Sequence, residues 1–329
     1  MSKDIGIDLG TANVLINVSG KGIVIDEPSV VAVDTNTNKV VAVGTEAYEM
    51  VGRTPGNIRV IRPLKDGVIA DFDITEAMLS YFIEKLNVKG FMSKPNILVC
   101  TPTGVTSIEQ KAIIQAAEKS GGGKVYLDYE PKVAAVGAGL DIFKPQGNMV
   151  IDIGGGTTDI AILSMGEIVT SKSLRYAGDR MNQAIVNYIK ANNQLLIGMR
   201  TAEAIKIEIG AATDPDPDAS MNVRGRDTID GLPKQIKVNS SEVTEALQEG
   251  LQSIIDTTKQ VLQETPPELS ADIIDRGIMI TGGGALLKNI DKLIADSLQV
   301  PVLIAESPLE SVALGTGILL QHIEKHERH

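Results

Sequence analysis

The chain has 329 residues, of which 43% are hydrophobic and 22% charged, and its formal net charge is −11. This composition is typical of a globular protein, and at this length we expect two domains. The negative charge argues against a nucleic-acid surface, so no nucleic-acid partner is predicted. No apolar run approaches the ~18 residues that span a bilayer. The single cysteine, Cys100, permits no internal disulfide, which suits the cytosol.

The first part of the chain alternates predicted strands and helices. Strands are predicted at the apolar stretches 5–7, 14–18 and 97–100. One helix is expected from Asp73, and a second is opened by a capping box formed by Thr106 and Glu109. Sequential β and α elements of this kind are typical of an α/β architecture.

The second part of the chain has a similar order. Strands are predicted at 149–153, 160–163 and 277–280. A long amphipathic helix is predicted from about Ser241 to Glu264, because Pro266 and Pro267 end it. Ser307 is expected to cap the last helix, with Pro308 in its first turn.

This order of elements suggests an internally duplicated fold. We predict a first half over residues 1–145 and a second over 146–315, with the C-terminal helix 316–329 returning to the first half. Smaller inserts are expected at about 33–65 and 179–242.

A glycine-threonine turn follows an aspartate twice. Asp8-Leu9-Gly10-Thr11 is repeated, 152 − 8 = 144 residues later, by a turn that starts at Asp152 and contains Gly154-Gly155-Gly156-Thr157. Glycines let backbone amides approach an anion, and an aspartate at a strand end can orient magnesium through its waters. One copy could be an ordinary hairpin, but the pair, with a third glycine run at 282–284, indicates that two facing hairpins bind a polyphosphate. The sequence has neither a P-loop nor a complete Gly-x-Gly-x-x-Gly motif.

Longer motifs surround these turns and extend over nearly the whole chain. They are Asp4–Asn13, Val51–Gly56, Arg62–Asp71, Glu130 with Ala134–Gly139, Asp152–Asp159, Ala177–Asp179, Asp275–Gly277 and Thr281–Leu287. Through them the chain resembles the actin-like ATPase superfamily and, more closely, the MreB/Mbl family of bacterial actins. The resemblance implies a duplicated actin-like, ribonuclease H-like α/β fold with two halves around a nucleotide cleft, each carrying a small inserted subdomain.

The resemblance also implies roles for individual residues around ATP and Mg²⁺. Asp8 and Asp152 are expected to face the magnesium ion. Glu130 is expected to orient the attacking water, with Thr157 and Asp159 as further catalytic residues. The phosphates are expected to be held by Gly10, Thr11, Ala12, Asn13, Gly154, Gly155, Gly156, Thr157 and Thr158.

The remaining nucleotide contacts are expected on the nucleoside side. The resemblance places Glu203 and Lys206 near the ribose and base, Asp179 at the closing edge, and the backbone of Gly282, Gly283 and Gly284 against the adenosine. Each assignment has a simpler alternative. Glu130, which precedes a proline, could be a solvated turn carboxylate, and Glu203 with Lys206 could form a surface ion pair.

Phe91 and Met92 form a candidate membrane contact. They stand between lysines in a predicted loop, and related proteins use a hydrophobic loop at this place. Both side chains could instead fold onto the core. Their insertion yields ~3–5 kcal/mol, which is too little to keep a monomer on a membrane, whereas a filament that repeats the contact gains avidity.

The leading hypothesis is therefore an ATP-dependent, cytoplasmic, actin-like cytoskeletal protein with slow, Mg²⁺-dependent hydrolysis. The family implies filaments, as double protofilaments, on the inner face of the cytoplasmic membrane. It also implies partners among the membrane proteins of cell-wall synthesis and morphogenesis. Two alternatives use the same site: a small-molecule kinase of this superfamily, and a scaffold that binds nucleotide without hydrolysing it.

Overall fold

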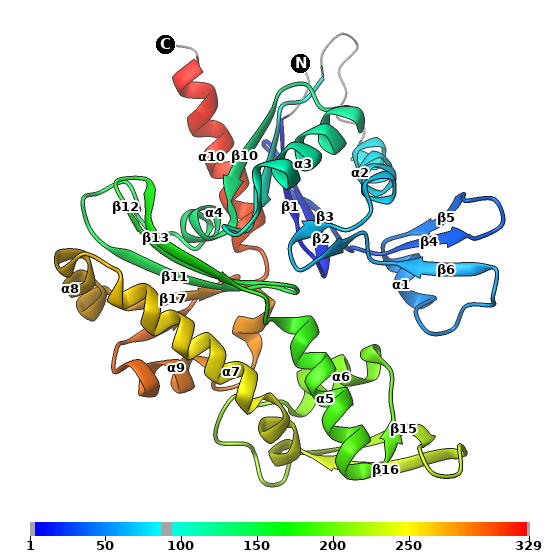
Figure 1. Cartoon of the computed structure of the whole chain (residues 1–329). Helices are drawn as coiled ribbons and strands as arrows, with labels where there is room; N and C mark the ends of the chain where they lie inside the picture. Colours follow the sequence, from blue (N-terminus) through cyan, green and yellow to red (C-terminus); the bar gives the residue numbers. More distant parts are fainter. Residues whose placement is uncertain (1–3, 87–93, 328–329) are drawn as a thin grey trace.

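A computed structural model describes residues 4–86 and 94–327 of the chain, and within these ranges two five-stranded sheets form the centre of the molecule (Figure 1). The first sheet has the order β10-β9-β1-β2-β3. Strand β1 pairs antiparallel with β2 and parallel with β9. The strands of this sheet are β1 (Ile5–Leu9), β2 (Asn13–Val18), β3 (Gly22–Pro28), β9 (Ile97–Thr101) and β10 (Val125–Tyr129).

The second sheet repeats the topology of the first. Its order is β13-β12-β11-β17-β18, with β11 antiparallel to β12 and parallel to β17. Each sheet therefore joins a three-stranded antiparallel meander to two further parallel strands, as an internal duplication requires. The second set of strands is β11 (Asn148–Ile153), β12 (Thr158–Ser164), β13 (Glu167–Leu174), β17 (Ile278–Thr281) and β18 (Val302–Ile304).

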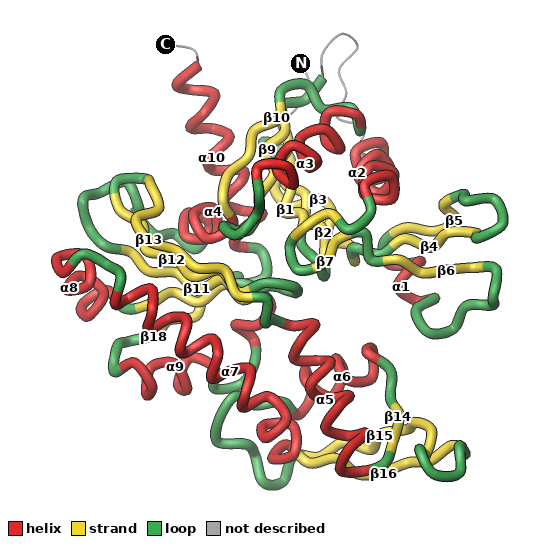
Figure 2. Tube along the Cα trace, viewed as in Figure 1, coloured by secondary structure: helices red, strands yellow, loops and turns green. Residues whose placement is uncertain are grey.

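Helices cover both sheets, and two of them lie between the sheets (Figure 2). In the core, α2 and α3 pack on the first sheet, while α5, α6, α7, α8 and α9 pack on the second. Residues of α4 and α10 form a cluster with Leu98 of the first sheet and Val150 of the second. The helices are α2 (Phe72–Leu86), α3 (Ser107–Lys119), α4 (Glu130–Gly137), α5 (Gly178–Asn193), α6 (Met199–Ile209), α7 (Ser240–Gln263), α8 (Pro267–Arg276), α9 (Ile290–Leu298) and α10 (Ser311–Glu327).

Two small sheets project from the halves, one over residues 31–61 and the other over residues 195–239. The sheet β5-β4-β6 carries the short helix α1 (Thr45–Glu49), and the sheet β14-β15-β16 lies beside α5 and α6 (Figure 1). The domain boundaries themselves stay a prediction. The remaining elements are β4 (Val31–Asp34), β5 (Val40–Val43), β6 (Ile58–Ile61), β7 (Leu64–Lys65), β8 (Val68–Ile69), β14 (Leu195–Leu196), β15 (Ser220–Asp227), β16 (Pro233–Asn239) and a 3₁₀ turn, η1 (Gly283–Leu286).

Local sequence signals account for several helix boundaries. The capping box predicted at Thr106 is present, because its side chain accepts from the Glu109 amide while the Glu109 carboxylate accepts from the Thr106 amide. The predicted start of the last helix at Ser307 is wrong, since α10 begins at Ser311. The carbonyl of Pro308 accepts a hydrogen bond from the Gly282 amide, which ties this segment to the glycine run as a turn.

The predicted membrane contact, Phe91 and Met92, lies outside the described residues. Among the helices that the structure does describe, none combines the length and apolar character needed to cross a bilayer.

The close packing of α4 against α10 can be tested with one methyl group. A Cβ added at Gly137 would overlap the backbone carbonyl of Ser311, and overpacking typically costs about 1–3 kcal/mol. We expect Gly137→Ala to lower the melting temperature by several degrees in a thermal unfolding experiment. Gly56→Ala is the control, because its added methyl meets open space. Equal melting temperatures for the two variants would contradict this packing.

Candidate functional site

The two glycine-threonine turns, which follow Asp8 and Asp152, face each other between the halves. Asp8 stands near the end of β1, and Asp152 stands at the corresponding place in β11. A Cβ added at Gly155 would lie 2.7 Å from the Cβ of Ala12, so only glycine allows the second turn to approach the first this closely. The predicted meeting of the two hairpins is therefore present in the structure.

Hydrogen bonds fasten each turn through its carbonyl oxygens. Ser29 donates from its hydroxyl to the Gly10 carbonyl at 2.5 Å, and the first amides of α5, those of Gly178 and Asp179, donate to the carbonyls of Gly154 and Gly155. In a planar trans peptide the next N–H points opposite to the bonded carbonyl. The amides of residues 11, 155 and 156 are therefore oriented away from these bonds, as an anion site requires.

A cavity of about 380 Å³ lies at the turns and is lined by both halves of the chain. It contains nearly all of the nucleotide-site residues that the sequence predicts. Those residues are Asp8, Gly10, Thr11, Ala12, Asn13, Glu130, Asp152, Gly154, Gly155, Gly156, Thr157, Asp179, Glu203, Lys206, Gly282, Gly283 and Gly284.

Thr158 and Asp159 lie behind the cavity wall instead of lining it. The Thr158 hydroxyl donates to the carbonyl of Tyr176, and the Asp159 carboxylate accepts from both the amide and the hydroxyl of Thr103. Thr103 follows β9 of the first sheet, so Asp159 links the two halves at the base of the cleft. The side chains of Thr158 and Asp159 are both fully buried.

Glu130 is the first residue of α4, and it is only 9% exposed. The alternative of a solvated turn carboxylate is therefore wrong. A carboxylate at a helix N-terminus is favoured by the helix dipole. Burial raises the pKa of Glu130 well above its usual range, and the charges of Asp159, Asp8 and Asp152 raise it further.

The two turn aspartates are likewise difficult to ionise together. Burial, then the charges of Asp152 and Asp26, raises the pKa of Asp8 to about 8. Burial raises the pKa of Asp152 to about 6, although the hydrogen bond from Thr281, 2.7 Å long, acts in the opposite direction. Carboxylates gathered in this way repel one another, and a divalent cation between them removes that repulsion.

The donor set fits magnesium better than a metal caged by protein groups. Within residues 4–86 and 94–327, no three histidine, cysteine or acidic side chains are grouped in a way that could hold a metal. Two carboxylates facing a cavity nevertheless suit Mg²⁺, which keeps several waters and is usually bound through one or two carboxylates plus substrate phosphates.

Glu203 and Lys206 line the same cavity and do not form the alternative surface ion pair. The Glu203 carboxylate accepts a hydrogen bond of 2.6 Å from the Tyr48 hydroxyl, and the Lys206 ammonium donates to the Gly178 carbonyl at 3.2 Å. Burial lowers the pKa of Lys206. Both side chains are thus positioned by groups of the cleft itself.

Sequence reasoning missed several residues of the site. Thr281 orients Asp152 through its hydroxyl, and Gly67 donates its amide to the Thr11 hydroxyl at 3.0 Å. Asp26 lines the cavity and accepts a hydrogen bond from Asn13 at 2.8 Å. A threonine directly before a glycine run was a usable signal for Thr281. Gly67 and Asp26 reach the turns only through tertiary contacts.

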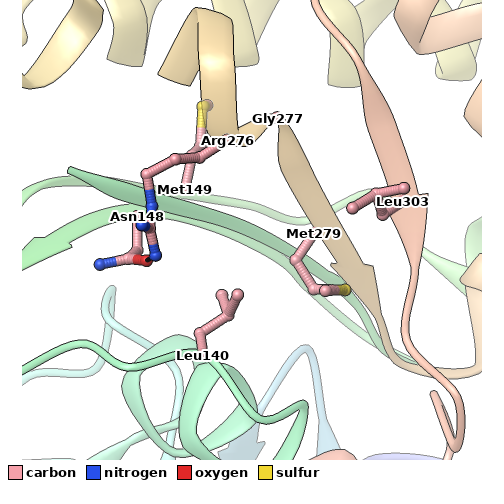
Figure 3. Close-up of a pocket in the computed structure, with 7 residues that line it drawn as sticks. All are labelled: Leu140, Asn148, Met149, Arg276, Gly277, Met279 and Leu303. Carbon is pink, nitrogen blue, oxygen red and sulfur yellow. Dashed lines mark hydrogen bonds between the residues drawn. The ribbon is translucent and has the colours of Figure 1, made fainter. Parts of the chain in front are cut away.

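A second cavity, of about 250 Å³, lies beside the N-terminal ends of β11 and β17, and Figure 3 shows the residues that line it. It contains none of the predicted site residues, and its lining has one charged side chain, that of Arg276, which donates to Asn148 and to Gln146. Its chemistry is therefore unlike that of the cleft. Its lining is Leu140, Asn148, Met149, Arg276, Gly277, Met279 and Leu303.

The duplicated sheets and the cleft between them define an actin-like nucleotide-binding architecture, and comparisons with known proteins agree. The solved structure of MreB 5 of Spiroplasma citri bound to AMPPNP matches with a TM-score of 0.95 and 42% identity, covering 100% of this chain and 98% of that one. The same protein bound to ADP matches with the same score and identity.

Sequence comparisons identify the family. The family model described as MreB/Mbl protein matches residues 2–328. Cell shape-determining protein Mbl of Bacillus subtilis is 64% identical over 324 residues, which are 98% of this chain and 97% of Mbl. Cell shape-determining protein MreB of Escherichia coli K12 is 49% identical over 330 residues, 99% of this chain and 95% of MreB. The chain belongs to the MreB/Mbl family.

The charge repulsion in the cleft predicts a pH effect on stability. Because the pKa of Asp8 in the folded protein is about 8 and that of an unfolded aspartate is about 3.9, the folded state binds more protons between these values. The stability that the protonated Asp8 carboxyl gives the folded state is then lost as pH rises toward 8. We expect Asp8→Asn to reduce the fall in melting temperature between pH 5.5 and 8.5, measured without nucleotide or Mg²⁺.

The control for this experiment is Asp296→Asn, which removes an exposed carboxylate that does not line the cavity. It should keep the pH dependence of the unmodified protein. If Asp8→Asn and the unmodified protein show parallel curves, burial does not disfavour the charged form of Asp8.

Proposed function

We propose that this protein binds ATP with Mg²⁺ in the cleft, hydrolyses it slowly, and assembles into actin-like filaments. The observation that carries the proposal is the pair of facing turns, with their amides, the two turn aspartates and Glu130 around one cavity. The AMPPNP and ADP complexes of a relative with 42% identity support a nucleotide at this place.

The residues of the turns would hold the phosphates from both sides. The amides of residues 11, 155 and 156 would bind the phosphate oxygens, and the Thr11 and Thr157 hydroxyls would add donors. Asp8 and Asp152 would hold Mg²⁺, which neutralises phosphate charge when bound. Phosphoryl transfer then depends mainly on positioning and charge stabilisation.

Glu130 is the candidate for positioning the attacking water. It is buried beside the two aspartates, and its carboxylate can accept a proton of the water and aim the oxygen at the terminal phosphate. Thr157 lines the same part of the cavity. Asp159, which binds Thr103, would act through the cleft base and not on the water itself.

The nucleoside would occupy the part of the cavity that Glu203, Lys206 and the glycine run 282–284 line. Glu203 can accept from the ribose hydroxyls, Lys206 lies one turn further along α6, and Asp179 stands at the first turn of α5. The glycine run 282–284 allows the base to lie against the backbone, because it presents no side chains.

The cellular role we propose follows from the curated relatives, whose names describe them as cell shape-determining. Filaments of this protein would lie in the cytoplasm on the inner face of the membrane. There they would organise proteins of cell-wall synthesis and morphogenesis. The sequence pattern of Phe91 and Met92 between lysines supports a membrane contact that a filament repeats many times.

Hydrolysis can be tested at Glu130. We expect Glu130→Gln to reduce phosphate release about 100-fold, because the amide cannot accept the proton, while nucleotide affinity stays near that of the unmodified protein. Phosphate release and fluorescent-nucleotide binding measure the two effects. Glu118→Gln, at an exposed site on α3, serves as the control. Unchanged phosphate release would favour a scaffold that binds ATP without hydrolysing it.

Assembly on membranes can be tested with anionic liposomes. We expect nucleotide-dependent filaments on the lipid, seen by co-sedimentation and negative-stain microscopy, and their loss from lipid in the Phe91→Ser/Met92→Ser variant, because two apolar side chains no longer insert. Filaments that stay on lipid in this variant would contradict the membrane contact. Monomers that consume ATP only with an added metabolite would indicate a kinase.

A further inference from the structure

Helix α6 contacts three different places. Arg200, Glu203 and Lys206 follow one another at intervals of three residues, so each is adjacent to the next on the helix surface. Arg200 reaches α1 of the first half, Glu203 lines the cavity, and Lys206 donates to Gly178 at the start of α5. A single rigid element thus joins the small sheet of the first half to the ligand cavity.

The contact between α1 and α6 consists of specific polar interactions. The Tyr48 hydroxyl donates to the Glu203 carboxylate at 2.6 Å. The Arg200 guanidinium donates to the carbonyls of Tyr48 and Glu49, at 3.4 and 3.3 Å, and lies over the Tyr48 ring at 4.7 Å from its centroid. A hydrogen bond to a charged acceptor is among the stronger ones available to a protein. We call this group of three side chains, Tyr48, Arg200 and Glu203, the α1–α6 contact.

The α1–α6 contact joins the halves at a place distant from their packed base. The halves are packed together at α4 and α10, whose residues join both sheets in one cluster. In Figure 1, α1 and α6 lie to the right of the molecule, whereas α4 and α10 lie to their left. A rotation of one half about the packed base would therefore separate α1 from α6 and widen the cavity between the halves.

Glu203 serves both the contact and the cavity. Its Oε2 atom is bound by Tyr48, which leaves Oε1 as an acceptor for a ligand hydroxyl. A hydroxyl bound at Oε1 and the Tyr48 hydroxyl at Oε2 can be present together, and each holds the carboxylate in the rotamer that the other needs. The two hydrogen bonds therefore favour each other, because the entropy cost of ordering the Glu203 carboxylate is met only once.

We propose that Tyr48 is a positioning residue that couples nucleotide occupancy to closure of the cleft, through its hydrogen bond to Glu203. This inference rests on the proposed function, because it requires a nucleotide hydroxyl at Glu203. Linkage makes the coupling reciprocal: the factor by which the α1–α6 contact tightens nucleotide binding is the factor by which nucleotide favours closure. Closure thereby reports whether the site is filled.

The test compares Tyr48→Phe with a matched variant, Tyr188→Phe. Tyr188 also donates to a glutamate, Glu245, at 2.8 Å, but that bond joins α5 to α7 within the second half. We expect Tyr48→Phe to speed the release of a fluorescent ATP analogue by about 3- to 10-fold in the presence of Mg²⁺, and Tyr188→Phe to leave it unchanged. The release is followed by stopped flow after addition of excess ATP.

A second readout measures closure directly. Dyes on Asn36→Cys and Ile229→Cys, both at exposed positions of the two small sheets, report the distance between the halves by energy transfer. Mg-ATP should raise the transfer efficiency, and Tyr48→Phe should reduce that rise while Tyr188→Phe keeps it. Arg200→Gln should act like Tyr48→Phe, which keeps the test usable if Tyr48→Phe folds poorly.

The possible outcomes distinguish failure of the proposed function from failure of the coupling. If the unmodified protein does not bind the ATP analogue, the proposed function fails and the coupling fails with it. If the unmodified protein binds it, but Tyr48→Phe and Arg200→Gln release it within twofold of the unmodified rate and close equally, the proposed function stands and the coupling is overturned.

Discussion

The structure depends on three carboxylates, those of Asp8, Asp152 and Glu130, which meet around one cavity between two halves. Each half places its carboxylate near the end of a central strand, and the glycine turns bring the strands face to face. Burial raises all three pKa values, and the charges of neighbouring aspartates raise them further. The unliganded cleft is therefore electrostatically strained, and a polyphosphate alone would add to this strain. A divalent cation would remove it, so the proposed Mg²⁺ would let a chain of net charge −11 bind an anionic nucleotide without a positive surface.

The duplicated topology explains how so few elements build the site. In both sheets the turn follows the strand that pairs antiparallel on one side and parallel on the other, so the two aspartates occupy equivalent places. Helices α4 and α10 lie between the sheets and hold them in one core. Glu130 opens α4, and Pro308 precedes α10 and accepts from the Gly282 amide. The helices that join the halves thus also position residues that line the cavity.

Contacts between the halves occur at two levels of the cleft. At the base, the fully buried Asp159 carboxylate accepts from Thr103, and at the mouth the partly exposed Glu203 carboxylate accepts from Tyr48. Breaking a hydrogen bond to a fully buried charge is costly, because that charge remains without water. A partly exposed carboxylate loses its partner more readily, since water replaces it. This difference favours motion at the mouth about a fixed base, and it assigns Asp159 to the connection between halves.

The sequence by itself determined the α/β class, the duplication, the hairpin pair and most of the cavity lining. These features follow from local patterns: apolar alternation, capping residues at Thr106, and glycine runs that only a close backbone approach explains. Tertiary structure decided the rest. Whether Glu130 is solvated or buried, and whether Glu203 binds Lys206 or Tyr48, depends on elements far apart in the chain. Ser307 has the sequence of a helix cap, yet its segment forms a turn because the Gly282 amide binds Pro308. Local propensity cannot register such partners, since burial and long-range hydrogen bonds exist only after the halves have packed.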